Sequence, residues 1–149
     1  MTNKITLYTC LIVWFSLTSM MSRATSEESS VVLVKDETKL VYREDVVYGR
    51  VHGAGLLADV AFPKAKESLP AILSVHGGRW KGGHKKDTST IKVKQWADFG
   101  FFAMSIDYRL VGCSPAPACY QDLQCAIRYL HANAQELHID TNRIFLMGQ

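Results

Sequence analysis

The 149-residue sequence is 48% apolar, 21% charged and 10% aromatic, which is typical of one globular domain and unlike disordered, collagenous or repeat proteins. The formal charge is +3, but two of the seventeen basic residues, Lys4 and Arg23, lie in an apolar leader. The remaining chain is close to electrical balance, which gives no reason to expect a nucleic acid or an anionic membrane surface as a partner.

The first 24 residues have the three parts of a secretory signal peptide. Lys4 gives a positive start, an apolar run follows over residues 5–21, and Ser22-Arg23-Ala24 places small residues at a cleavage site. We expect a secreted or periplasmic protein whose mature chain starts at Thr25. An uncleaved anchor is the alternative, disfavoured by the short run. Residues 25–45 are then a linker or N-terminal segment, and residues 46–149 form the domain.

The domain opens with two antiparallel strands over residues 46–51 and 56–62, joined by a turn at residues 52–55. Short apolar runs at 70–76, 101–106 and 143–147 predict buried parallel strands, the last of them preceded by a turn at 140–142.

Two helices are expected between these strands. The first is capped near Asp87 or Thr88 and stops at Gly100. The second covers residues 120–134, and its apolar stripe is Leu123, Ala126, Ile127 and Leu130. A hairpin followed by alternating strands and helices predicts an open α/β sheet with right-handed crossovers. Ligands bind such sheets at the carboxyl ends of the strands, which is where His76, Asp107 and Gly148 lie.

The last strand delivers a glycine into a turn, which is half of a G-x-S-x-G nucleophile elbow. Gly148-Gln149 would be the "G-x", and position 150, beyond this sequence, the nucleophilic serine. Further motifs precede it in order: His76-Gly77-Gly78-Arg79-Trp80, Asp107-Tyr108-Arg109-Leu110, Asp122 with residues 126–130, and Asp140-x-x-Arg143-Ile144. The ordered set resembles the α/β-hydrolase carboxylesterases of the HGGxW type, including feruloyl and acetylxylan esterase-like and hormone-sensitive-lipase-like proteins. The resemblance covers about residues 46–149 and implies the N-terminal part of an α/β-hydrolase fold.

Acyl transfer builds negative charge on a carbonyl oxygen, and preorganised backbone N–H groups must point at it. Glycines after a strand let the backbone approach that closely, so Gly77 and Gly78 are candidates for the oxyanion hole, with a simple tight turn as the alternative. If this loop is exposed, a valine at position 78 should leave folding intact. Arg79 replaces the third glycine of the family pattern, which leaves the role of its own N–H open.

The resemblance also implies supporting roles for four residues. His76 orients the loop rather than acting as a base, and Gly148 forms the elbow. Trp80 either packs in the core or lines the pocket, and Asp107 anchors its strand end by pairing with Arg109 or with a backbone donor. The lysines of the basic run are expected to form a solvated face; they are Lys81, Lys85, Lys86, Lys92 and Lys94.

The resemblance therefore implies a secreted serine carboxylesterase that works through an acyl-enzyme on a small-molecule or carbohydrate-linked ester, without a cofactor. The chain as given lacks the nucleophile and is expected to be inactive. An arylformamidase-like amide hydrolase and a non-catalytic hydrolase-fold binding protein remain alternatives. No metal-binding spacing is present. Cys113 and Cys119 either close a disulfide ring or, with Cys125, are small packing residues.

Overall fold

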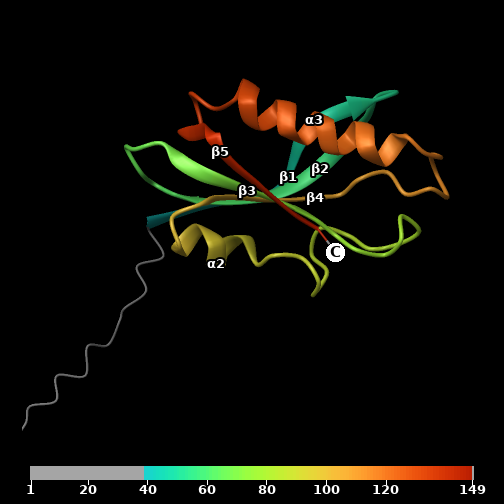
Figure 1. Cartoon of the computed structure of the whole chain (residues 1–149), viewed down its shortest axis with the longest axis horizontal. Coiled ribbons are helices and arrows are strands. Elements are labelled where there is room, and N and C mark those ends of the chain that lie inside the picture. The colour runs from blue at the N-terminus through green and yellow to red at the C-terminus, as the bar shows by residue number, and fades with distance from the viewer. Residues whose placement is uncertain (1–38, 149) are drawn as a thin grey trace, which may run out of the picture. The chain divides into compact units, whose positions relative to one another are not determined.

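The computed structural model describes residues 39–148, so the predicted signal peptide lies outside the described residues. The described part is a five-stranded mixed sheet with one helix on each face (Figure 1). It contains no helix long and apolar enough to cross a membrane.

The predicted hairpin is present as β1 (Leu40–Val51) and β2 (Ala54–Pro63). Strand β1 starts at Leu40 rather than at residue 46, so the segment predicted as a linker includes residues 40–45 of the strand. The pairing register shifts between Arg43 and Val46, and Asp45 within this bulge has a positive φ of 53°. A bulge breaks the alternation of apolar and polar residues on which strand prediction depends, which explains the late predicted start.

The three parallel strands are β3 (Leu69–Val75), β4 (Phe102–Ile106) and β5 (Ile139–Gly148), and the sheet order is β1-β2-β4-β3-β5. Val75 pairs with Ile106 on one side and with Gly148 on the other. The carboxyl ends of the three strands are therefore level, and the residues that follow them leave the sheet at one edge, as predicted.

The turn predicted at residues 140–142 is retained as an irregularity inside β5. The partners of β3 jump from Ile139 to Ile144. The Asp140 carboxylate accepts hydrogen bonds from the Asn142 backbone N–H (3.0 Å) and from Arg143 Nε (2.6 Å). Beyond the bulge, β5 forms the edge of the described sheet with Phe145, Leu146 and Met147 exposed.

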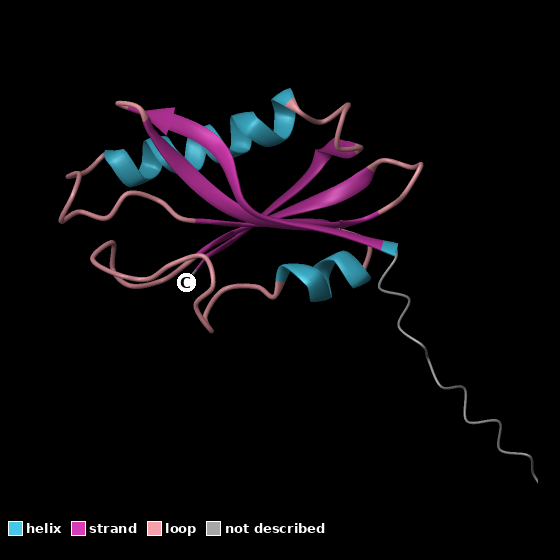
Figure 2. Cartoon of the chain, turned by 180° about the vertical axis from the view of Figure 1, so that it is seen from behind, coloured by secondary structure: helices cyan, strands magenta, loops and turns pink. Residues whose placement is uncertain are grey.

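Helix α3 (Ala118–Ala132) covers one face of the sheet and α2 (Val93–Asp98) the other (Figure 2). On α3, Ala126 and Leu130 are fully buried, while Leu123 and Ile127 are partly buried against the same core, which confirms the predicted stripe.

Helix α2 is much shorter than predicted, because it begins at Val93 and not near Asp87. Asp87 instead closes a turn, since its carboxylate accepts a hydrogen bond from the His84 backbone N–H at 2.9 Å. The predicted stop is confirmed, because Gly100 lies just past the helix with a φ of 89°.

Candidate active site

The loop after β3, called the glycine loop, folds back on itself. Its outgoing limb, residues 76–78, packs against its return limb, residues 82–85. Gly78 has a φ of 116°, and a β-carbon at this position would overlap the carbonyl oxygen of Gly82. Gly83 has a φ of 99°, and a β-carbon there would overlap the His76 ring. Only glycine combines this conformation with this close approach. A valine at position 78 would therefore force the two limbs apart. The expectation that folding stays largely intact in that variant stays a prediction.

Arg79 and Trp80 form the tip of the loop, with φ values of 53° and 60°. Residues other than glycine rarely adopt this left-handed backbone conformation, because it costs roughly 1–2 kcal/mol per residue. The strain at Arg79 gives a physical reason for the glycine that the family pattern has there. Trp80 is half-exposed and lines a pocket, so the pocket alternative holds and core packing does not.

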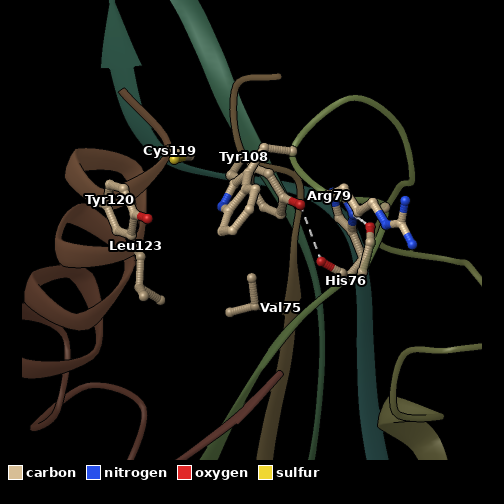
Figure 3. Close-up of a pocket in the computed structure, with 10 residues that line it drawn as sticks. Val75, His76, Arg79, Tyr108, Cys119, Tyr120 and Leu123 are labelled. Carbon is tan, nitrogen blue, oxygen red and sulfur yellow. Dashed lines mark hydrogen bonds between the residues drawn. The ribbon is translucent and has the colours of Figure 1, made fainter. Parts of the chain in front are cut away.

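His76 is buried at the base of the loop (Figure 3). Its Nδ1 donates a hydrogen bond to the Gly77 carbonyl oxygen at 2.8 Å, because that oxygen can only accept. The Tyr108 ring stacks on the imidazole with a centroid distance of 4.2 Å, and the Tyr108 hydroxyl donates to the His76 carbonyl oxygen at 3.1 Å. These contacts tie the loop to the end of β4, as an orienting role requires. The role itself stays a prediction.

A pocket of about 380 Å³ opens between this loop and the start of α3 (Figure 3). Gly77 and Gly78 lie in its wall, and most of the lining is apolar or aromatic. The lining residues are Val75, His76, Gly77, Gly78, Arg79, Trp80, Tyr108, Cys119, Tyr120 and Leu123. Backbone N–H donors beside a mainly apolar cavity are what an acyl-transfer site needs.

The three cysteines within residues 39–148 are free thiols, so the disulfide between Cys113 and Cys119 is not formed. Cys119 is buried in the pocket wall, whereas Cys113 is exposed. Cys125 lies with its Sγ 3.6 Å from the Tyr48 carbonyl oxygen. Cys119 and Cys125 thus match the packing alternative. Within residues 39–148 no three His, Cys, Asp or Glu side chains are grouped to hold a metal ion.

Asp107 anchors the end of β4 through a backbone donor, which is one of the two predicted alternatives. Its Oδ1 accepts a hydrogen bond from the Lys85 backbone N–H at 2.6 Å, and its carbonyl oxygen accepts one from the Tyr48 hydroxyl at 2.7 Å. Burial is the main cause that raises the pKa of Tyr48 above its ordinary range, so this hydroxyl stays a donor in alkaline solution as well as at neutral pH. The alternative pairing of Asp107 with Arg109 is wrong.

Arg109 instead binds Asp122, which the sequence offered as part of the ordered motifs but without a partner. The guanidinium contacts both carboxylate oxygens at 2.7–3.0 Å, and the Arg109 backbone N–H donates to the same carboxylate at 2.8 Å. The Asp122 side chain is 1% exposed. The side-chain hydrogen bond to Asp122 is the main cause that raises the pKa of Arg109. The pair fixes the start of α3, and with it the pocket wall, to the end of β4.

The family comparison can now be set beside this geometry. The model of the BD-FAE family matches residues 58–149, which is more than half of the chain. The chain belongs to the BD-FAE family. The BD-FAE match begins inside β2 and includes the parallel strands, the glycine loop and every residue of the pocket.

Solved structures similar to this BD-FAE chain include esterases with the α/β-hydrolase fold. Thermogutta terrifontis esterase 2, phosphonylated by cyclosarin, is 26% identical with a TM-score of 0.65 over 72% of this chain and 42% of that one. A butyrate-bound esterase from the same species is 25% identical with a TM-score of 0.63 over 74% of this chain and 40% of that one. The predicted α/β-hydrolase fold is confirmed.

Curated relatives give the same family context. Carboxylesterase NlhH of Mycobacterium tuberculosis is 31% identical over 86 residues, which are 58% of this chain and 27% of that protein. The non-reducing polyketide synthase ausA of Penicillium brasilianum is 41% identical over 78 residues, which are 50% of this chain and 3% of that protein. The BD-FAE chain thus spans well under half the length of these relatives.

Proposed function

We propose that this chain carries the oxyanion side of a serine carboxylesterase site, and that the residue after Gln149 in the complete protein is the nucleophilic serine. The observation that carries the proposal is the strand register, in which Val75 pairs with Gly148. A β-carbon at Gly148 would lie 4.0 Å from Val75. The loop with Gly77 and Gly78 therefore starts beside the end of β5. A serine in a turn directly after Gly148 and residue 149 would then face the glycine N–H groups.

The reaction follows from this placement. The serine hydroxyl attacks the ester carbonyl, and the negative charge on its oxygen is met by the N–H groups of Gly77 and Gly78 together with that of the residue after the serine. The alcohol leaves, and water then hydrolyses the acyl-enzyme. The triad acid and histidine are assigned to the part of the protein that follows the serine. Covalent phosphonylation of the similar T. terrifontis esterase supports a nucleophilic mechanism.

The pocket supports a small ester as the substrate, either a free small molecule or an ester linked to a carbohydrate. Its volume of about 380 Å³ and its apolar lining suit a short acyl chain, and butyrate is bound in the similar esterase structure. The half-exposed rings of Trp80 and Tyr120 at the pocket offer flat surfaces to the rest of the substrate.

Reading the coding sequence beyond codon 149 is the first test, and we expect serine at position 150. The complete protein should then hydrolyse p-nitrophenyl butyrate, and replacing that serine by alanine should abolish turnover. Glycine or alanine at position 150 would contradict the proposal and favour the non-catalytic binding protein. Faster turnover of an N-formyl aryl amide than of the ester would instead favour the amide hydrolase.

We also propose that the protein is exported and that its mature chain begins at Thr25. The positive start, the apolar run and Ser22-Arg23-Ala24 support this. N-terminal sequencing of protein from the medium or periplasm tests it. A chain that keeps Met1 in the membrane fraction would contradict cleavage.

A further inference from the structure

Lys85 lies at the end of the return limb of the glycine loop, where its ammonium group meets three carboxylates. The Nζ atom is 2.9 Å from Asp45, 3.3 Å from Asp107 and 3.7 Å from Asp59. The Lys85 side chain is only 10% exposed and that of Asp59 only 4%. The expectation that Lys85 belongs to a solvated face is therefore wrong, because its side chain is buried in a charge cluster at whose rim Asp107 and Asp45 are 35% and 61% exposed.

The main chain of Lys85 is also held on both sides. Its N–H donates to Asp107 Oδ1 at 2.6 Å. Its carbonyl oxygen accepts hydrogen bonds from Ser105 Oγ at 2.8 Å and from Thr90 Oγ1 at 3.1 Å. These contacts connect the return limb to β4, while the side chain connects it to the bulge of β1 through Asp45 and to β2 through Asp59.

Gly82 and Gly83 connect Lys85 to the oxyanion candidates Gly77 and Gly78. Gly83, two residues before Lys85, packs against His76 and the Gly77 carbonyl oxygen, and the Gly82 carbonyl oxygen packs against Gly78. A shift of the return limb would therefore change the packing against Gly77 and Gly78, because the limbs are too close at these glycines to admit even a β-carbon.

We propose that Lys85 is a positioning residue for the oxyanion loop, holding the return limb against Gly77 and Gly78 by binding the carboxylates of Asp45, Asp59 and Asp107. Its structural part stands on the contacts above, and its catalytic consequence rests on the proposed esterase function. Burial lowers the pKa of Lys85, but the hydrogen bond to Asp45 and the charges of Asp107 and Asp59 outweigh it, so the pKa is raised and the group stays charged.

The loop offers a matched control. Lys81 lies in the same loop and is exposed, and its side chain forms no ion pair with any described residue. Its backbone N–H donates to the Gly78 carbonyl oxygen at 3.0 Å, a contact that a side-chain substitution retains. Lys81→Met therefore removes the same charge from the same loop without removing the tether.

The first measurement is hydrogen–deuterium exchange of the complete protein. Lys85→Met should speed exchange of the peptide covering residues 77–83 by about tenfold or more, the effect of losing a charge-assisted hydrogen bond in a local opening. Peptides from β4 should be unchanged, as should the loop in Lys81→Met. Lys85→Arg keeps the charge and should restore most of the protection. Unchanged exchange in Lys85→Met, or equal changes in both methionine variants, would overturn the proposal.

A second variant separates positioning from the harm done by a poorly compensated buried charge. Without Lys85, the Asp59 carboxylate keeps Lys86 Nζ at 3.8 Å and the Asp45 backbone N–H at 3.1 Å. Lys85→Met combined with Asp59→Asn removes this buried carboxylate charge. If Lys85 positions the loop, exchange stays fast in the double variant. If protection returns to the wild-type level, the effect came from the Asp59 charge and the proposal fails. The double variant also covers the case in which the single variant does not fold.

The kinetic readout is the division between kcat and KM for p-nitrophenyl butyrate. A misplaced oxyanion donor should lower kcat by roughly 10–100-fold, because a shift of about 1 Å can cost about 100-fold, while KM stays within about twofold. Equal kcat in wild type and Lys85→Met would overturn the catalytic part. A wild-type protein that hydrolyses no ester would refute the proposed function, while the exchange result would still decide the role of Lys85.

Discussion

The Arg109–Asp122 pair gives the sharpest stability prediction. Arg109→Met removes the guanidinium, so the carboxylate of Asp122, 1% exposed, keeps only the hydrogen bond from the backbone N–H of residue 109. Breaking a buried pair by removing one partner typically costs about 3–5 kcal/mol. Whole domains are stable by only about 5–15 kcal/mol, so the expected loss is a large part of the total.

Urea unfolding followed by circular dichroism measures this loss. For a slope of about 1–3 kcal/mol per molar urea, the midpoint should fall by more than about 1 M with little change in the slope. Asp122→Asn introduced into Arg109→Met removes the orphan charge and should recover part of the stability.

Arg143→Met is the matched control, because it removes the more exposed ion pair with Asp140. The side chain of Arg143 is 52% exposed and that of Asp140 is 25% exposed. Such surface pairs contribute less than about 1 kcal/mol, so the control midpoint should barely move. Similar losses in Arg109→Met and Arg143→Met would refute the reasoning that burial makes the first pair costly to break.

Three further predictions concern the loop, the thiols and the end of β4. Gly78→Ala should lower the free energy of unfolding by more than about 1 kcal/mol. In the control Gly82→Ala, the added β-carbon meets nothing within 4 Å, so the free energy of unfolding should change by less than about 0.5 kcal/mol. Equal effects would contradict the close packing at Gly78. Native alkylation should label the exposed Cys113 before the buried Cys119, and a mass showing a disulfide between them would overturn the free-thiol assignment. Tyr48→Phe should cost about 1 kcal/mol in the same urea assay, and no loss would show that its hydroxyl bond is replaced.

Much of the fold could be predicted because it depends on local patterns of apolar and polar residues. The parallel strands are short apolar runs, and the stripe on α3 has helical spacing, so both were found close to their observed positions. The early part of β1 was missed because the bulge at Asp45 reverses the alternation. The predicted start of the first helix is wrong because Asp87 closes a turn with His84 instead of capping a helix.

The glycine loop could be anticipated because an oxyanion hole requires preorganised backbone N–H groups that approach the substrate closely at a strand end, which glycine allows. The groups that hold it could not. Lys85 meets carboxylates from the bulge of β1, from β2 and from the end of β4, and Asp122 meets Arg109 from another element. Such partners are brought together only by the sheet order, and no spacing along the chain reports them.

The sheet order has a consequence for synthesis of the chain on the ribosome. Both neighbours of β3, namely β4 and β5, follow it in the sequence, whereas β1 and β2 can pair as soon as they emerge. With about 5–20 residues added per second, roughly 4–15 s separate the completion of β3 from that of β5. During this interval the apolar strand Leu69–Val75 lacks at least one partner and is open to aggregation or to chaperone binding.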